Sequence, residues 1–106
     1  MALTIGEIRK MVKDEKIQWR GHMLKRMKQR GINISDVLEC ISNGEIIEQY
    51  ENDYPYPSCL ILGTSVNNSV LHVVCAVGDG YVWMITAYFP SADEWMPDYK
   101  TRREKR

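Results

Sequence analysis

A histidine and two arginines recur at intervals of four residues in the first third of the chain. His22, Arg26 and Arg30 stand at positions i, i+4 and i+8, which puts all three along one side of a helix. An arginine holds phosphate through a planar fork of N–H donors, and a neighbouring histidine exchanges a proton near neutral pH. With Lys25 beside them, these residues suit a phosphodiester substrate. The alternative is a solvated, charged helix face that carries a histidine.

A second histidine interrupts an apolar segment, since His72 stands among the valines and the leucine of residues 70–74. A histidine within an apolar strand needs partners for its ring nitrogens. It acts either as a general acid or base or as a structural group that is hydrogen-bonded to a neighbour. Proximity to the helix that carries His22 would favour catalysis.

Two hydroxyl groups near the end of the last apolar segment complete the candidates. Strict alternation predicts Val82, Met84, Thr86 and Tyr88 on one face of a strand. Thr86 and Tyr88 are then neighbours, where they could position a phosphate, and Tyr88 could act as a general acid. The alternative is a half-exposed pair of the kind that is common in sheets.

Three helices are predicted to position the histidine and the arginines. The first follows a capping box of Thr4 and Glu7, in which each side chain accepts from the backbone amide of the other residue. The third helix follows a cap at Asn33 or Ser35 and ends in a left-handed turn at Gly44. It is short, about two to three turns.

The second helix, which carries the histidine–arginine row, is predicted over residues 19–30. Trp19, Met23 and Met27 form an apolar stripe that should face the core, and the row lies beside this stripe. Gly31 follows as a left-handed C-terminal cap.

After these helices the periodicity becomes that of extended chain, rich in β-branched and aromatic residues. Four strands are predicted, over residues 46–50, 59–64, 70–77 and 81–89. Asn67-Asn68 and Gly78-Asp79-Gly80 supply the positive φ angles of tight turns, so the last three strands should form a meander.

Two segments flank these strands. The connection over residues 51–58 contains two prolines, which predict a stiff, extended loop that could form the rim of a site. The end of the chain is expected to make a helical turn over residues 93–96 and then a frayed, basic tail. Trp95 and Asp98 should pack this tail back, and Asp98 could also pair with an arginine of the second helix.

Together these patterns predict a single α+β domain over residues 1–106, with N-terminal helices packed on one antiparallel four-stranded sheet. Its parts are a helical part over 1–44, the sheet over 45–90 and a C-terminal turn and tail over 91–106. Composition is ordinary for one globular core, with 44% hydrophobic and 26% charged residues. Neither a membrane span nor a signal-peptide core is evident, so a cytoplasmic protein without membrane contact is expected.

Cysteine and motif usage predicts neither metal nor cofactor. Cys40, Cys59 and Cys75 are odd in number and none belongs to a CxxC pair, so buried free thiols are expected. The sequence contains no P-loop, dinucleotide-binding glycine motif, HExxH motif or nucleophile elbow.

Charge is balanced in sum but separated along the chain, with 14 basic and 14 acidic residues. Basic residues crowd the second helix and the C-terminus, whereas residues 39–53 are acidic. Binding of RNA would therefore require the acidic stretch to lie away from the basic helix.

Five short motifs suggest a relationship. They are H-x-L-x-R-M-x-x-R-G-I from His22, N-G-E-I-I-E, Y-P-x-x-L-I-L-G, L-H-V-V and I-T-A-Y-x-P. With these motifs the segment from His22 to Tyr88 resembles an uncharacterised family of small bacterial proteins, grouped near the BrnT, MqsR and RelE toxins. Those toxins are compact α+β ribonucleases that are paired with small antitoxins.

The resemblance implies a toxin of a type II toxin–antitoxin pair that cleaves messenger RNA without a metal. It implies His22 or His72 as the proton-transfer group, and Arg26 and Arg30 as a phosphate clamp. Tyr88 would orient the substrate or act as an acid, and Lys25 and Thr86 would bind it. The implied partners are a cognate antitoxin and RNA or the ribosome, and a homodimer through an exposed edge strand is compatible with this function.

A non-catalytic protein-interaction module of a small bacterial complex is the competing hypothesis. In it, Tyr54, Tyr56, Trp83 and Trp95 form an aromatic contact surface, and the arginines only pair with carboxylates. The two hypotheses differ in geometry. A ribonuclease requires the candidate residues to converge in one cleft, whereas the interaction module predicts buried arginine–carboxylate pairs without an open polar pocket.

Overall fold

The computed structural model describes residues 2–104 and contains three helices and five strands. Their order along the chain is α1 (Ile5–Lys13), β1 (Ile17–Trp19), α2 (Gly21–Arg30), α3 (Ile34–Asn43), β2 (Glu45–Tyr50), β3 (Ser58–Thr64), β4 (Val70–Gly78) and β5 (Tyr81–Tyr88). The α+β class is therefore confirmed. Within residues 2–104, no helix is long and apolar enough to cross a membrane.

The sheet has five strands in the order β1-β5-β4-β3-β2, so the prediction of four strands is wrong. The additional strand, β1, runs parallel to β5, with Ile17 opposite Val82 and Trp19 opposite Met84. Trp19 therefore belongs to a strand, and α2 begins only at Gly21. A strand of three residues is too short to show a period of two, and its pairing with β5 overrides the local helical pattern.

The predicted signals at the ends of α1 and α2 are confirmed. Thr4 and Glu7 form the capping box, with N···O distances of 3.0 and 3.2 Å. Gly31 ends α2 at φ 71° in the left-handed region. Met23 and Met27, on one side of α2, are both buried in the core.

The predicted N-terminal cap of α3 is confirmed, but its predicted C-terminal turn is not. Its N-cap is Asn33, whose backbone N–H donates to Asp36 Oδ2 at 2.9 Å. The predicted left-handed turn at Gly44 is wrong, because φ there is −94°. A Cβ atom on Gly44 would lie 2.5 Å from the carbonyl oxygens of both Cys40 and Leu62. Glycine is required at this position because neighbouring backbone lies too close for a Cβ atom. A positive φ angle is not the reason.

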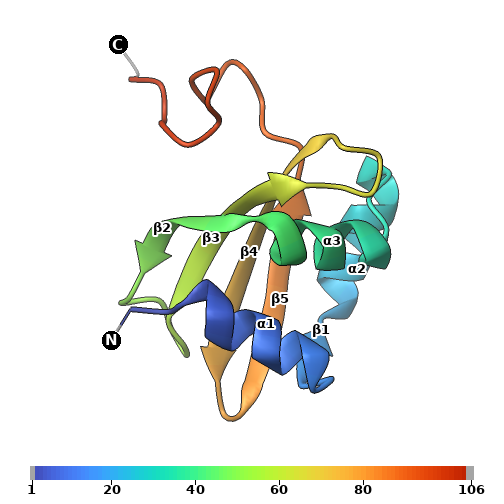
Figure 1. Ribbon diagram of the computed structural model, residues 1–106, viewed down its shortest axis with the longest axis vertical. Coiled ribbons are helices and arrows are strands. Elements are labelled where there is room, and N and C mark those ends of the chain that lie inside the picture. Colours follow the sequence, from blue (N-terminus) through green and yellow to red (C-terminus); the bar gives the residue numbers. More distant parts are fainter. Residues whose placement is uncertain (1, 105–106) are drawn as a thin grey trace.

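The sheet has one face covered by helices and one without helical cover. Figure 1 shows α1 and α3 lying across the same face, and the core forms between them and the sheet. The sheet contributes to this core Cys59, Ile61, Leu71, Val73, Cys75, Val82, Met84 and Ala87. Side chains of the opposite set of strand positions point to the other face, called the open face below. It carries Glu48, Tyr50, Leu60, His72, Val74, Ala76, Trp83, Thr86 and Tyr88.

A β-bulge in β5 decides which residues share the open face. The register shifts between the pairs Val74–Thr86 and Cys75–Met84, which leaves Ile85 as an extra residue. Thr86 and Tyr88 share a face as predicted. Val82 and Met84 were predicted on the same face as Thr86 and Tyr88, and this prediction is wrong. Strict alternation does not hold across a bulge, so Val82 and Met84 point into the core.

The C-terminal segment is attached to the sheet through Tyr99 O, which bonds to His72, and through the pair of Arg102 with Glu48. The frayed tail, predicted over residues 101–106, is therefore wrong for residues 101–104. Within the segment, the backbone N–H of Met96 donates to Thr101 O at 2.8 Å, and that of Arg103 to Glu94 O at 2.9 Å. Asp98 accepts from the backbone amides of Lys100 and Thr101. The alternative prediction, in which Asp98 pairs with an arginine of α2, is therefore wrong. The last two residues of the predicted tail lie outside the described residues.

Candidate functional site

Two pockets of the open face lie at different positions along β5. One of them, called the arginine pocket, has a volume of about 440 Å³. It is lined by Arg30, Tyr88, Phe89, Ser91, Glu94, Trp95 and Arg102. The pocket therefore joins the end of α2, the end of β5 and the C-terminal segment.

Arg30 reaches this pocket from the last turn of α2. Its Nη1 donates to Thr86 Oγ1 at 3.2 Å and to Ala87 O at 2.9 Å. The carbonyl of Ala87 accepts this bond because β1 pairs with β5 only as far as Met84. Both bonds come from Nη1, and within residues 2–104 neither Nη2 nor Nε makes a hydrogen bond. The guanidinium is therefore held in place while donors remain for an anion.

Tyr88 and His72 form a hydrogen-bonded pair behind the pocket. His72 is fully buried, with Nε2 at 2.9 Å from Tyr99 O and Nδ1 at 3.2 Å from the Tyr88 hydroxyl. A carbonyl only accepts, so Nε2 carries the proton, and Nδ1 accepts from Tyr88. Burial lowers the pKa of His72 and raises the pKa of Tyr88, so His72 is neutral and Tyr88 protonated at neutral pH.

Trp95 closes the other side of His72. The two rings meet edge to face with their centroids 4.6 Å apart, and Trp95 is 2% exposed. The Arg102 guanidinium lies 4.6 Å from the centroid of the Trp95 ring and makes a two-pronged pair with Glu48, at 2.9 and 3.0 Å. The hydrogen bond from Arg102 lowers the pKa of Glu48. Tyr50 also donates to this carboxylate, and burial, with the same bond, raises the pKa of Tyr50 to about 12.

The buried imidazole predicts a loss of stability in mild acid. Since the pKa of His72 is lower in the folded than in the unfolded chain, its neutral form stabilises the fold fully above the unfolded value of 6.5, and this stability is lost as pH falls through the folded value. Thermal unfolding should therefore show a melting temperature that falls from about pH 7.5 to about pH 5. His72→Gln should reduce this fall, and His22→Gln, at an exposed site, should not. Equal pH dependence in the wild type and His72→Gln would contradict the buried neutral imidazole.

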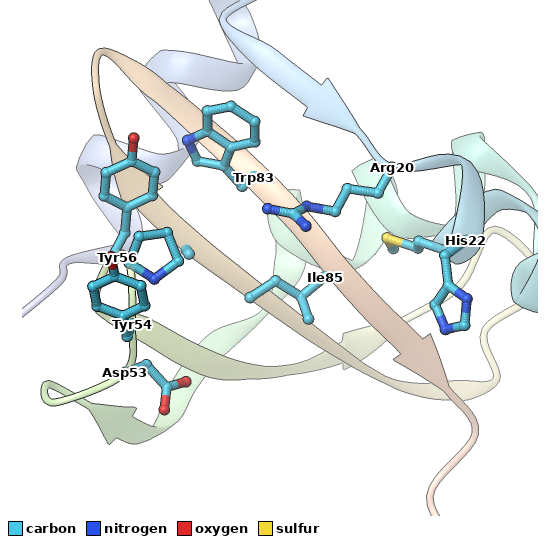
Figure 2. A pocket seen from close by; sticks show the side chains of 10 residues that line it. Arg20, His22, Asp53, Tyr54, Tyr56, Trp83 and Ile85 are labelled. Atoms are coloured by element: carbon cyan, nitrogen blue, oxygen red, sulfur yellow. The ribbon is translucent and has the colours of Figure 1, made fainter.

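The second pocket of the open face, called the aromatic pocket, has a volume of about 470 Å³ (Figure 2). Its lining is Arg20, His22, Met23, Asp53, Tyr54, Pro55, Tyr56, Ala76, Trp83 and Ile85. Figure 2 shows Tyr54 and Tyr56 on one side, His22 on the other, and Arg20 extending between them toward Trp83. The proline-containing loop therefore forms the rim of a pocket, as its sequence predicted.

The structure brings together four of the seven residues predicted for the site. Arg30, Thr86, Tyr88 and His72 converge at the arginine pocket. His22 lines the aromatic pocket instead, because positions i and i+8 are about 12 Å apart along a helix. Lys25 and Arg26 are exposed on α2 and belong to the lining of neither pocket.

Three residues that line these pockets or pair with a residue of the lining were not found from the sequence. Arg20 was assigned to the second helix, but it lies at the junction of β1 and α2 and points across the sheet (Figure 2). Glu48 and Arg102 are 54 positions apart, and nothing local predicts their pairing. In the sequence, the one indication of a polar group on this face is that Glu48 and Tyr50 stand two positions apart in a strand and therefore share a face.

The acidic stretch is separated from the basic helix only in part, because Asp53 lines the aromatic pocket together with His22 of α2. The acidic strand β2 lies at one edge of the sheet, whereas α2 packs beside β5, three positions away in the sheet order. Two acidic residues of β2 are paired with the C-terminal segment, as Lys100 with Glu45 and Arg102 with Glu48. Among residues 2–104, no group of three or more histidine, cysteine, aspartate or glutamate side chains is placed to hold a metal ion.

Fold and site together define a small α+β protein whose sheet is covered by helices on one face and carries the arginine pocket and the aromatic pocket on the other. A model of the family described as domain of unknown function DUF4258 matches residues 19–89, and the chain belongs to this family. No curated protein and no solved structure gave a significant match. The matched range includes α2 and β2–β5, and with them all seven predicted site residues. The family description names no activity, so the relationship to toxins stays a prediction.

Proposed function

We propose that this chain is a metal-independent endoribonuclease that cleaves messenger RNA at the arginine pocket, as the toxin of a pair with an antitoxin protein. The observation that supports this most is the convergence of Arg30, Thr86, Tyr88 and His72 at one end of the open face. A fixed cation beside a tyrosine–histidine pair supplies both charge stabilisation and proton transfer for a phosphodiester.

The Tyr88–His72 pair would activate the ribose 2′-hydroxyl. Since Tyr88 donates its proton to His72 Nδ1, the lone pairs of its oxygen remain to accept from the ribose. As the 2′-oxygen attacks phosphorus, Tyr88 takes the ribose proton and passes its own to His72. Burial disfavours the protonated imidazole and lowers the pKa of His72, and this is opposed in part by the hydrogen bond to Tyr99 O and by the charge of Glu48. The P–O5′ bond breaks, and the 5′-oxygen takes a proton from water. The hydroxide ion that results takes a proton from the Tyr88–His72 pair, which restores neutral His72, and a 2′,3′-cyclic phosphate remains.

Arg30 would hold the phosphate during this reaction. Its Nη1 is anchored to Thr86 and Ala87, so that Nη2 and Nε can donate to a non-bridging oxygen as negative charge develops there. Because the guanidinium is already fixed, little reorganisation is needed in the transition state.

Tyr88→Phe tests the reaction with the smallest change. It removes one hydroxyl and keeps the ring, so cleavage should fall by roughly a hundredfold or more, as expected for loss of a proton-transfer group. The assay is regulated expression in a bacterial host, with growth and RNA integrity measured. Tyr81→Phe is the matched control, because Tyr81 lines neither of the two pockets.

The expression experiment has one outcome that supports the proposal and one that contradicts it. Growth arrest and RNA cleavage by the wild type and the Tyr81→Phe variant, but not by Tyr88→Phe, would establish the proposed role. Normal growth and intact RNA at high soluble expression of the wild type would contradict the proposal.

A second candidate, a non-catalytic interaction module, is favoured by the Arg102–Glu48 pair. That hypothesis expects buried arginine–carboxylate pairs, and Glu48 is 22% exposed while Arg102, which covers Trp95, is 56% exposed. Its expectation of a surface without an open polar pocket does not fit the arginine pocket. The negative outcome of the expression experiment would favour this module.

A further inference from the structure

We propose that the aromatic pocket binds unpaired RNA bases by stacking, so that the substrate is single-stranded RNA that follows the open face from one pocket to the other. This inference rests on the proposed function, since it names the substrate of the same face. It concerns residues that the cleavage reaction does not use, which lets the two be tested apart.

The aromatic side chains of the pocket are fixed as a platform. Tyr56 and Trp83 stack with centroids 5.8 Å apart and an interplanar angle of 26°. Trp83 Nε1 donates to Gly78 O at 3.0 Å, which sets the orientation of the indole. Tyr56 lies directly over Gly78, where a Cβ atom would be 2.0 Å from its ring. Rigid aromatic surfaces of this kind bind bases with little loss of side-chain entropy.

Tyr54 is an exposed aromatic residue beside this platform. Its exposed fraction is 95%, so the fold gains almost nothing from its ring. Ile85, which lines the same pocket, is 38% exposed. A base inserted here would cover apolar surface that water now contacts, and stacking on aromatic side chains is how proteins hold unpaired bases.

Arg20 adds a cation in the correct place for a nucleic-acid strand. Its guanidinium lies 5.8 Å from the centroid of the Trp83 ring, where it can stack and also donate to a phosphate. His22 stands at the opposite side of the pocket as a second donor. A purely apolar protein contact would leave these polar groups and Asp53 without partners on burial.

The two pockets are spaced for one strand. His22 lines the aromatic pocket and Arg30 the arginine pocket, and these residues are about 12 Å apart along α2. At about 3.4 Å per stacked nucleotide, this distance corresponds to roughly four nucleotides. A base-paired strand would not present its ring faces to the platform, since those faces are stacked within the duplex.

The test is a binding measurement with RNA that the chain cannot cleave by the proposed reaction. A short, fluorescently labelled 2′-O-methyl oligoribonucleotide has no free 2′-hydroxyl, so wild-type protein can be used, and its affinity is compared with that for the same strand in a duplex. Single-stranded RNA should bind more tightly. Tyr54→Ala should weaken binding by roughly five- to a hundredfold, the range expected for loss of one stacked base.

Arg20→Lys and Ile34→Ala complete the design. Lysine keeps the charge of Arg20 but not its planar stacking surface, so affinity should fall. Ile34→Ala removes an exposed apolar side chain (46%) from α3, on the helix-covered face, and affinity should not change. Equal binding of single strand and duplex, or unchanged binding by Tyr54→Ala, would overturn the inference and favour a protein ligand for this pocket.

Failure of the inference and failure of the proposed function give different results. Cleavage of RNA with unchanged binding by Tyr54→Ala would overturn only the stacking site. Tight, Tyr54-dependent binding of single strands without cleavage of natural RNA would overturn only the nuclease.

Discussion

Arg30→Ala is expected to lower RNA cleavage by about a hundredfold or more, which is the effect of removing one fixed donor from a developing oxyanion. The substitution removes the only arginine that α2 contributes to the arginine pocket. It also removes the bonds to Thr86 and Ala87, so a loss of stability of about 1 to 2 kcal/mol is expected. Cleavage rates of purified variants, measured with folded protein at equal concentration, check the prediction.

Lys28→Ala and Arg30→Lys provide the controls for this substitution. Lys28 is an exposed cation on the same helix and outside both pockets, so its loss tests whether charge on α2 alone matters. Arg30→Lys keeps the charge but not the fork, and it should restore only part of the activity. Equal loss in Lys28→Ala and Arg30→Ala would assign the effect to general attraction of RNA and would contradict a specific phosphate contact.

Gly44→Asn is expected to have the largest effect on stability, a loss of about 3 kcal/mol or more. A Cβ atom at this position meets two backbone carbonyl oxygens at 2.5 Å, and backbone cannot move aside as a side chain can. The free energy of unfolding from denaturant titration measures the effect.

Gly31→Asn is the matched control, because the same side chain enters at a glycine with φ 71° and no atom within 4 Å of the added Cβ. Asparagine tolerates the left-handed region, so a cost of no more than about 1 kcal/mol is expected. If the two variants lost equal stability, Gly44 would be a turn residue, as its sequence context predicts, and the close approach would be refuted.

Features set by neighbouring residues could be predicted from the sequence. The capping box of Thr4 with Glu7 depends only on positions three apart, and Gly31 follows directly after the helix that it ends. The turn between β4 and β5 likewise follows from Asp79 and Gly80, which have φ angles of 55° and 81°.

Features set by distant contacts could not be predicted. β1 exists because the edge of β5 is available to it, and the bulge at Ile85 reverses the expected faces of β5 without a local signal. The sequence context of Gly44 predicts a turn residue. Only the structure shows that the backbone of α3 and of β3 lies too close to this position for a side chain.

The candidate site divides in the same way. The pairing of Tyr88 with His72 follows from the register of β4 and β5, which the sequence indicated only as a meander. His22 was expected with Arg30 because both lie on one side of a helix. Their separation along that helix places them at different pockets.

The most direct test of the central claim is the chemistry of the RNA ends. Purified wild-type protein is incubated with messenger RNA in EDTA, and with bacterial ribosomes translating that RNA in their normal buffer. The proposed reaction predicts fragments with a 2′,3′-cyclic phosphate and a 5′-hydroxyl in at least one mixture, and their loss in the Tyr88→Phe variant. Intact RNA in both mixtures, or fragments that carry a 5′-phosphate, would contradict a nuclease that uses the ribose 2′-hydroxyl.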